Sequence, residues 1–388
     1  MSQKIYLFIC LFSNIYIFFD ELIKQDFSIY HIIWGSISLL LSYILCYFIF
    51  QKFKNLKLGN PKYFFKINYS RFNYFMFIYG IIMIIYSLIY DDFKAGGMVV
   101  TSSSIFASLF PYNGIFYYYY CICRKDYKKS VYINTGLFFF YNLINGYVGI
   151  IMILFFYELH FLFQNKTISS FKCFIYSFGS TILGIFAYSF FSPIKWSIRH
   201  GADFKVLSLS DSADKLLSRI SHLHTTIFSI ENIDFIKESY LQQEIALMEF
   251  KTYFRPIIPS FIFKNKLFHS VGNIIHNKLY NYTRTNGTDS PSILTYLNVL
   301  GKCDFISFLG WLILTVFSLL MIKYICNKLQ SYEGQFDMLF FWLIVATLSI
   351  CGNLETLFSN SYIKIVFFIP VLFFMKIIKL KKRENIDV

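Results

Sequence analysis

The feature that most constrains this sequence is a series of long apolar runs, interrupted by one polar stretch from Pro193 to Cys303. Most of the runs have about 17–23 residues, the length that an α-helix needs to cross a bilayer. Backbone amide and carbonyl groups find no water inside lipid, so they must be paired within the segment that crosses it. The runs therefore predict transmembrane helices, and the polar stretch predicts one large segment outside the membrane.

The composition also indicates a membrane protein. Only 15% of the residues are charged, whereas soluble domains carry about 25% charged residues. We therefore expect an all-α, polytopic membrane protein with about ten transmembrane helices. The fifth and sixth runs are separated by Asn145 and Gly146, which interrupt a stretch too long for one crossing. The predicted spans are Ile5–Phe19, Tyr30–Phe50, Tyr74–Tyr90, Ser103–Ile122, Val131–Leu143, Gly146–Phe163, Phe174–Ser192, Phe305–Cys326, Met338–Ile350 and Tyr362–Ile378.

The distribution of charge predicts how these helices are oriented. Lys and Arg gather in the loop Gln51–Asn73, in the loop at 124–129 and at the C-terminus, whereas the short loops between them are mainly acidic. Basic loops stay in the cytoplasm. Both termini are therefore expected in the cytoplasm, and the large loop is expected on the outer face.

The same charges account for the formal net charge of +14 without a polyanionic partner. No groove of basic and aromatic residues is evident, so nucleic acid is not an expected partner. The chain divides into residues 1–193 with seven predicted spans, 194–303 as the large loop, and 304–388 with the last three spans and a cytoplasmic tail.

The 8 Cys lie mostly inside or at the ends of apolar runs. There is no CxxC pair and no Cys–His spacing of the zinc-binding type. We therefore expect buried cysteines that act as small hydrophobic residues, with no disulfide framework, no metal and no cofactor.

The large loop is expected to be helical. Apolar residues recur at helical spacing in three stretches, 212–228, 234–253 and 265–280. The apolar residues expected to face inward include Leu241 in the second stretch, and Val271 and Ile274 in the third. Ser210, Asp211 and Ser212 offer caps for the first helix. Arg219, His222 and Thr226 are three and four residues apart, so one continuous helix would place them on one flank.

Four arginines of the outer segments are candidates for binding an anion: Arg199, Arg219, Arg255 and Arg284. Arginine carries a permanent charge and a planar fork of donors that suits phosphate. The alternative is that each is a solvated charge or an anchor to lipid headgroups. His200, just beyond the seventh span, is a candidate contact for an acceptor sugar.

The polar loop Tyr282–Ser292 leads into the next predicted helix. Ser290 or Ser292 can cap a helix that starts at Pro291. A helix N-terminus at the boundary between lipid and water favours an oxyanion. Simple capping of the helix is the alternative interpretation.

Three segments carry a resemblance to a known family. Phe254-Arg-Pro-Ile-Ile-Pro-Ser-Phe-Ile-Phe-Lys264 is similar to a pattern of Arg next to Pro, a second Pro and then Lys. Ser290-Pro-Ser-Ile-Leu-Thr-Tyr-Leu-Asn-Val-Leu-Gly301 is similar to a Ser-Pro-Ser run followed by Leu-Asn-x-x-Gly, and Arg219-Ile-Ser-His222 resembles an Arg-x-x-His segment. Together with the expected topology, they resemble the Wzy-type polymerases of oligosaccharide repeat units, the O-antigen polymerase family.

The resemblance implies an enzyme of the bacterial inner membrane. It would join undecaprenyl-diphosphate-linked repeat units into O-antigen or capsular polysaccharide at the periplasmic face, without a metal. Its implied partners are membrane lipid and a regulator of chain length. The catalytic residues would be His222 as base, with Arg219 and Arg255 on the diphosphates. The substrate-binding residues would be Arg199, His200, Lys264, Arg284, Asp289 and Ser290.

Two other functions fit the same sequence features. A ligase of similar architecture would move finished glycan onto a lipid core. A flippase or other transporter of lipid-linked sugar would line a cavity within the spans with polar residues. Charges inside the spans are few, Glu158 and His160 being the main ones, and this counts against a proton-driven transporter.

Overall fold

A computed structural model describes eleven parts of the chain. These are residues 2–56, 63–90, 112–124, 128–146, 154, 158, 169–200, 203–242, 270–280, 291–328 and 370–382. Most of these residues are helical. Four of the helices are long and apolar enough to cross a membrane, at Lys4–Lys24, Ile29–Phe53, Tyr69–Ile89 and Ser170–Ile198. The protein is therefore a helical membrane protein, and these helices match the first, second, third and seventh predicted spans.

The described elements form one series of helices with a small sheet. The helices are α1 (Ser2–Lys24), α2 (Ile29–Asn55), α3 (Tyr69–Ile89), α5 (Tyr112–Cys123), α6 (Lys128–Ile144), α8 (Ser170–His200), α9 (Leu209–Ser221), α10 (Leu223–Glu231), α11 (Ile233–Leu241), α13 (Val271–Tyr280), α14 (Ile293–Cys303) and α15 (Phe305–Lys328). The strands are β1 (Tyr63–Ile67) and β2 (Ile378–Lys382).

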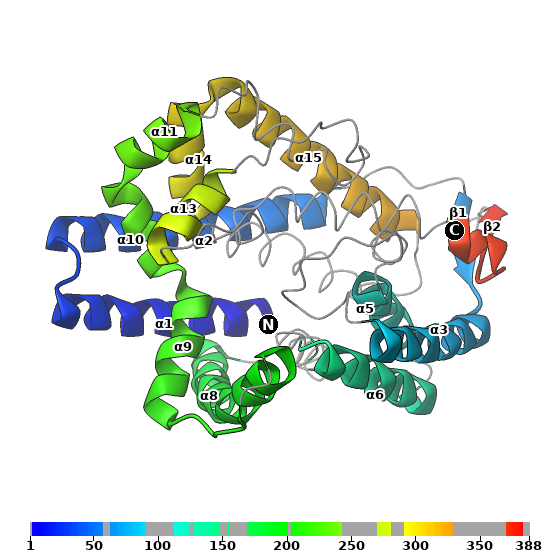
Figure 1. Ribbon diagram of the computed structural model, residues 1–388. Coiled ribbons are helices and arrows are strands. Elements are labelled where there is room, and N and C mark those ends of the chain that lie inside the picture. The colour runs from blue at the N-terminus through cyan, green and yellow to red at the C-terminus, as the bar shows by residue number, and fades with distance from the viewer. Residues whose placement is uncertain are drawn as a thin grey trace.

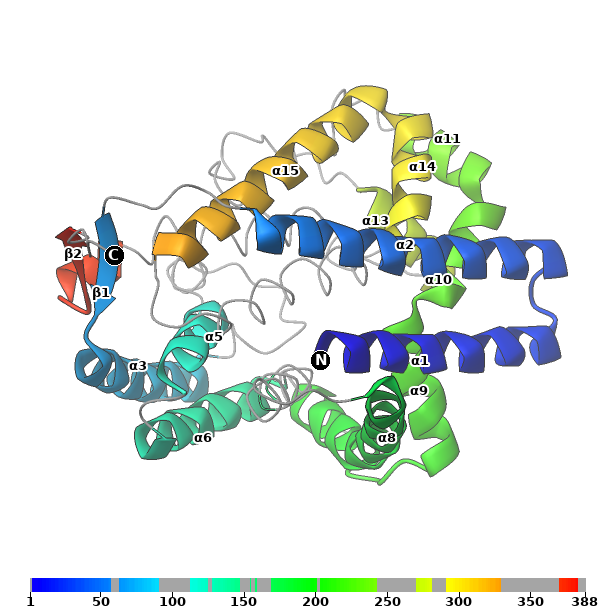
Figure 2. The same ribbon diagram turned by 180° about the vertical axis from the view of Figure 1, so that it is seen from behind.

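Helices α1 and α2 form an antiparallel hairpin (Figure 1). The described helices from α9 to α14, which belong to the predicted large outer loop and are called the outer segment, are built around it. Helices α8 and α9 pack on α1, while α10 and α14 pack on α2. Viewed from behind, the hairpin still lies between α15 on one side and α8 on the other (Figure 2). The helices predicted in the large loop therefore pack directly against the first two spans.

Helices α3, α5 and α6 form a second group with an aromatic core. The rings of Phe116 and Phe138 stack with centroids 3.7 Å apart. A polar link ties the three helices together, because Asn134 Nδ2 donates to the Tyr119 hydroxyl at 2.6 Å and to the Asn73 carbonyl at 3.1 Å. Packing and hydrogen bonding between helices both stabilise membrane proteins, in which burial of apolar surface alone gives little drive.

Helix α8 continues through Pro193 to His200, so it extends past the predicted end of the seventh span at Ser192. Its 31 residues span about 46 Å at 1.5 Å per residue, more than the hydrocarbon core requires. Proline has no N–H for the Ser189 carbonyl four residues earlier. That carbonyl accepts a hydrogen bond from Leu207 N at 3.2 Å instead, so the chain after α8 folds back along it.

The first predicted loop helix, 212–228, is two helices in the structure. The chain breaks at His222, whose φ of 51° lies in the left-handed region, and the Ser221 hydroxyl accepts from Leu223 N at 2.9 Å. A serine side chain that bonds to nearby backbone competes with the helix. The shared flank predicted for Arg219, His222 and Thr226 is therefore wrong. The predicted caps are also wrong, since Ser208 caps α9.

The other two predicted loop helices are shorter where they are described. Helix α11 ends at Leu241, which is 55% exposed rather than facing inward. In α13, Val271 and Ile274 are buried as the spacing predicts. Residues 243–253 and 265–269 of these predictions lie outside the described residues.

The fourth and eighth predicted spans are confirmed as helices in part. Helix α5 covers the end of the fourth, and α15 covers the eighth with an apolar portion at Phe305–Met321. The fifth predicted span corresponds to α6. Residues 103–111, most of 146–163, and 338–350 lie outside the described part of the chain.

A two-stranded antiparallel sheet departs from the all-α expectation. Strands β1 and β2 pair with Lys66 opposite Lys379. The predicted tenth span does not remain helical to Ile378, because residues 370–374 are helical and the chain then turns at Lys376, where φ is 54°. The sheet joins the basic loop after α2 to the basic C-terminal segment, so these two predicted cytoplasmic segments lie on the same end of the molecule.

Candidate functional site

Titratable side chains gather where the α1–α2 hairpin meets α9 and α10. The Tyr16 hydroxyl donates to Asp214, and His31 Nδ1 lies 3.7 Å from a Glu231 carboxylate oxygen. His224 Nδ1 lies 2.6 Å from Glu21 Oε1. Each pair joins the hairpin to the outer segment across a long separation in sequence. This junction is the candidate functional site.

The pair of Glu21 and His224 has the geometry of a carboxylate that orients a base. A carboxylate only accepts hydrogen bonds, so Nδ1 donates and Nε2 is left as the acceptor nitrogen. The Glu21 side chain is 4% exposed, whereas that of His224 is 38% exposed. The buried carboxylate therefore holds an imidazole that solvent or a substrate can reach.

The second oxygen of the Glu21 carboxylate is also buried. Oε2 has no hydrogen-bond partner among the residues that the structure describes. An ionised carboxylate with one unsatisfied oxygen is costly in a low-dielectric environment. The contact from His224 Nδ1 is therefore important for the stability of this buried carboxylate.

Glu21 and His224 each lie at the end of a helix. Glu21 lies in the last turn of α1, just before Gln25, whose φ of 57° ends the helix. His224 lies in the first turn of α10, directly after the break at His222. The N-terminal end of a helix favours a nearby carboxylate. The edge of the Phe27 ring packs against His224 with centroids 5.2 Å apart and limits its rotation.

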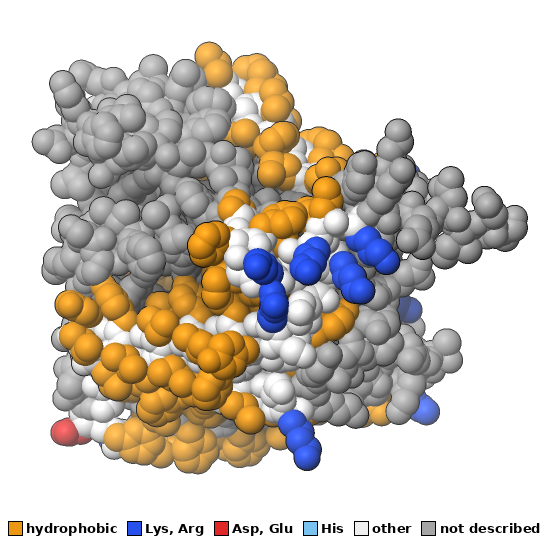
Figure 3. Space-filling view, turned by 90° about the vertical axis from the view of Figure 1, so that its right-hand side faces the viewer, with side chains coloured by type: hydrophobic (Ala, Val, Ile, Leu, Met, Phe, Trp, Pro, Cys, Tyr) orange, Lys and Arg blue, Asp and Glu red, His pale blue; other side chains and the backbone are white. Residues whose placement is uncertain are grey.

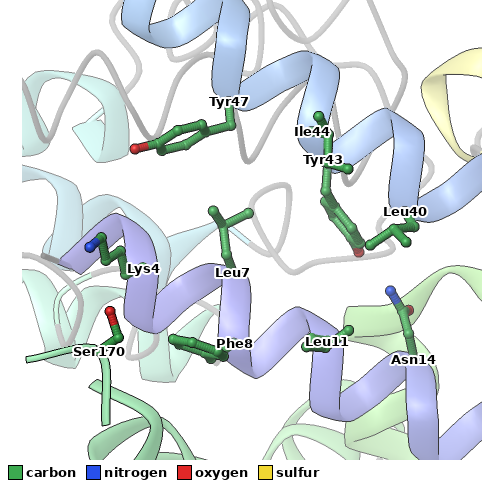
Figure 4. Close-up of a pocket in the computed structure, with 10 residues that line it drawn as sticks. All are labelled: Lys4, Leu7, Phe8, Leu11, Asn14, Leu40, Tyr43, Ile44, Tyr47 and Ser170. Carbon is green, nitrogen blue, oxygen red and sulfur yellow. The ribbon is translucent and has the colours of Figure 1, made fainter. Parts of the chain in front are cut away.

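An apolar cavity of about 370 Å³ lies between α1 and α2 (Figure 4). Its lining residues are Lys4, Leu7, Phe8, Leu11, Asn14, Leu40, Tyr43, Ile44, Tyr47 and Ser170. On α1, Leu7, Leu11 and Asn14 recur at three- and four-residue steps, and two further steps reach Glu21. The cavity and the buried carboxylate therefore belong to one stripe of α1.

Hydroxyl groups of the protein accept hydrogen bonds from backbone amides at the start of α14. Ser292 caps the helix by accepting from Thr295 N, the Ser292 N–H donates to Thr226 Oγ1 at 2.9 Å, and Leu294 N donates to Ser42 Oγ at 3.2 Å. Of the two predicted caps, Ser292 is confirmed. These amides are engaged within the protein, so capping, rather than an oxyanion site, describes them.

The other predicted site residues are distributed as follows. His222 is half-buried and links α9 to α10, and Arg219 lies in the last turn of α9. Arg199 and His200 end α8. The remaining candidates lie outside the described residues: Arg255, Lys264, Arg284, Asp289 and Ser290.

Sequence reasoning missed the pairing of Glu21 with His224. The two residues are 203 positions apart, so no local spacing connects them. The available signals were weak: Glu21 is an acidic residue at the predicted outer end of a span, and His224 is one of several histidines in the predicted loop.

Comparison with protein-family models, curated proteins and solved structures gives no match for this chain.

Proposed function

We propose that this protein is a glycosyltransferase that polymerises undecaprenyl-diphosphate-linked oligosaccharide repeat units. The observation that carries the proposal is the pair of Glu21 and His224, which lies on the same stripe of α1 as an apolar cavity. A lipid-linked sugar needs an apolar surface for its tail and a base for the acceptor hydroxyl. The cavity supplies the first and His224 the second.

The proposed step is a single displacement at the anomeric carbon of the growing chain. His224 Nε2 takes the proton from a hydroxyl of the acceptor sugar as that oxygen attacks. The bond between the anomeric carbon and the diphosphate oxygen breaks, and the leaving diphosphate keeps the electron pair. Glu21 stabilises the imidazolium that forms. This displacement inverts the configuration at the anomeric carbon.

The leaving diphosphate needs positive charge, which the arginines of the outer segment supply in this proposal. Arg219 is close in sequence to His224, and Arg255 and Arg284 have the charge and donor geometry that suit phosphate. In this scheme Arg199, His200, Lys264, Asp289 and Ser290 contact the substrates. The resemblance implies His222 as the base, whereas this proposal assigns that role to His224, so the two histidines need a direct comparison.

The proposed topology places about ten spans in the bacterial inner membrane, with both termini in the cytoplasm and the segment from α9 to α14 in the periplasm. Two features support it. The outer segment packs at the acidic end of the α1–α2 hairpin, and the basic segments that border β1 and β2 gather together. Lipid-linked repeat units would then meet Glu21 and His224 at the periplasmic face.

The test uses purified protein with lipid-linked repeat units in detergent. His224→Ala should lower the rate of chain lengthening by about 10²- to 10⁴-fold, the usual contribution of a general base. His222→Asn is the matched variant, because asparagine tolerates the left-handed backbone at this position. It should retain most of the activity. Loss of activity in His222→Asn with an active His224→Ala would contradict the assignment, and no lengthening by the unaltered protein would contradict the function.

A transporter of lipid-linked sugar is favoured by a different observation. Glu158 is held by Arg124, with contacts of 2.6 and 2.9 Å, and by the Tyr120 hydroxyl. Glu158 lies in the sixth predicted span, and an ionisable residue within a span often marks a transport pathway. A transporter would move labelled substrate across vesicles and yield no longer product. A ligase would instead transfer glycan to a lipid core, and its deletion would leave that core bare.

A further inference from the structure

The small sheet is amphipathic. Side chains alternate between the two faces of a strand, so the register places Lys66, Lys379 and Lys381 on one face. The opposite face carries Ile67 and Ile378, which are buried. On that face the Phe65 ring also packs edge-on against Phe373, with centroids 5.3 Å apart. Leu380 on this face is 55% exposed, so the sheet packs through Ile67, Ile378 and Phe65 and presents the three lysines on its other face.

This lysine face has an excess of positive charge. Lys66 and Lys379 stand directly opposite each other, an arrangement that destabilises a sheet unless an anion lies between the charges. Neither segment that builds this end of the molecule, 63–90 or 370–382, contains Asp or Glu. Figure 3 shows Lys and Arg side chains gathered on this face, bordered by apolar side chains. An anion from outside the protein would offset the repulsion.

The sheet must lie at one surface of the membrane. Helix α3 starts at Tyr69, two residues after β1, and has 21 residues. At 1.5 Å per residue it spans about 31 Å, which matches the hydrocarbon thickness of a bilayer. The end of α3 that carries the sheet is therefore at the level of the lipid headgroups, where Tyr69 and Tyr74 are also favoured.

An apolar groove of about 470 Å³ begins at this end of α3. Ser70 and Arg71, in the first turn of α3, border it. Tyr74, Ile78 and Ile82 continue it along α3 at four-residue steps, and Met375 and Ile377 close its side. A groove that is apolar along its length and polar at its start fits an acyl chain below a phosphate.

We propose that this groove and the lysine face form a binding site for one anionic phospholipid. Its acyl chain lies along Tyr74, Ile78 and Ile82, and its phosphate meets Arg71 and the lysines Lys66 and Lys379. The headgroup offsets the repulsion within the sheet, and the chain fixes the C-terminal segment against α3. The site is independent of the proposed glycosyltransferase activity.

The test measures lipid binding by the delipidated full-length protein in detergent, through the rise in thermal midpoint on adding lipid. Half of the maximal rise in thermal midpoint should be reached with dioleoyl phosphatidylglycerol at a mole fraction about tenfold lower than with dioleoyl phosphatidylcholine. The triple variant Lys66→Gln/Arg71→Gln/Lys379→Gln should lose this preference. The matched control is Lys205→Gln/Lys215→Gln/Lys237→Gln, three exposed lysines of the outer segment, which should keep it.

Two further measurements distinguish binding of a phospholipid from binding of free phosphate, and loss of charge from loss of folding. Inorganic phosphate and glycerophosphoglycerol, at equal ionic strength, should give no shift because they lack the acyl chain. The conservative variant Lys66→Arg/Lys379→Arg should retain the preference, which separates loss of charge from loss of folding. Equal binding of both phospholipids, a retained preference in the triple glutamine variant, or a full shift with phosphate alone would each overturn the proposal.

Discussion

At the scale of single residues, the carboxylate of Glu21 is buried and depends on His224 for a hydrogen bond. Its side chain is 4% exposed, with one oxygen bonded to His224 and the other lacking a partner among the described residues. Removing the hydrogen-bond donor of a buried carboxylate leaves that acceptor unsatisfied, which typically costs about 1–3 kcal/mol. Glu21 and His224 should therefore be energetically coupled.

A double-mutant cycle measures this coupling. Glu21→Gln and His224→Ala should each lower the thermal midpoint, and the double variant should lose much less than the sum. The expected coupling energy is about 1–3 kcal/mol. Asp20→Asn is the matched control, since Asp20 bonds to Lys24 rather than to the histidine, and its effect should add to that of His224→Ala. Additive effects for Glu21→Gln would show that the pair is not coupled.

At the scale of elements, the contact between α2 and α10 depends on the absence of a side chain at Gly35. A Cβ placed there would lie 2.7 Å from Ile227 Cγ1, and the Ile227 side chain is fully buried. Small residues let helices approach closely inside membranes. Because α10 carries His224 in its first turn, this contact also sets the distance between the imidazole and α1.

Alanine at Gly35 should therefore lower the thermal midpoint, because the fully buried Ile227 side chain would have to shift. The comparison is Gly179→Ala in α8, where a Cβ would meet nothing within 4 Å. Alanine is favoured over glycine in a helix by about 0.8–1 kcal/mol, so Gly179→Ala should be neutral or stabilising. Equal midpoints for the two variants, measured in the same detergent, would show that α10 does not pack closely on α2.

At the scale of the whole molecule, the described chain has two ends of different chemistry. The acidic turn between α1 and α2 meets α9 and α10 at one end, and the basic sheet lies at the other (Figure 1). Helix α15 runs from the outer segment toward the basic end in both ribbon views. This polarity agrees with the orientation that the charge of the short loops predicts.

Cysteine labelling in whole cells tests the orientation. On a background without native cysteines, Lys215→Cys should react with a membrane-impermeant maleimide from the outside. Lys379→Cys should react only after the inner membrane is opened. Both positions are exposed, so a lack of labelling would reflect compartment rather than burial. The reverse pattern would place Glu21 and His224 in the cytoplasm, out of reach of a periplasmic substrate.

Much of the helical framework could be predicted from local sequence. Apolar runs located α1, α2, α3 and α8, because a backbone in lipid has few alternatives to a helix. The break at His222 could not be predicted, because Leu216, Ile220, Leu223 and Ile227 keep helical spacing across it. The sheet was also missed, since its strands come from opposite ends of the chain.

The sequence by itself determined that this is a helical membrane protein, because hydrophobic length and loop charge act locally. Only the tertiary structure decided which side chains meet. Glu21 reaches His224 because α10 packs on α2 beside α1, and Lys66 faces Lys379 because two distant strands pair. Such contacts depend on how helices pack and on which chain ends come together, and no periodicity along the chain encodes either.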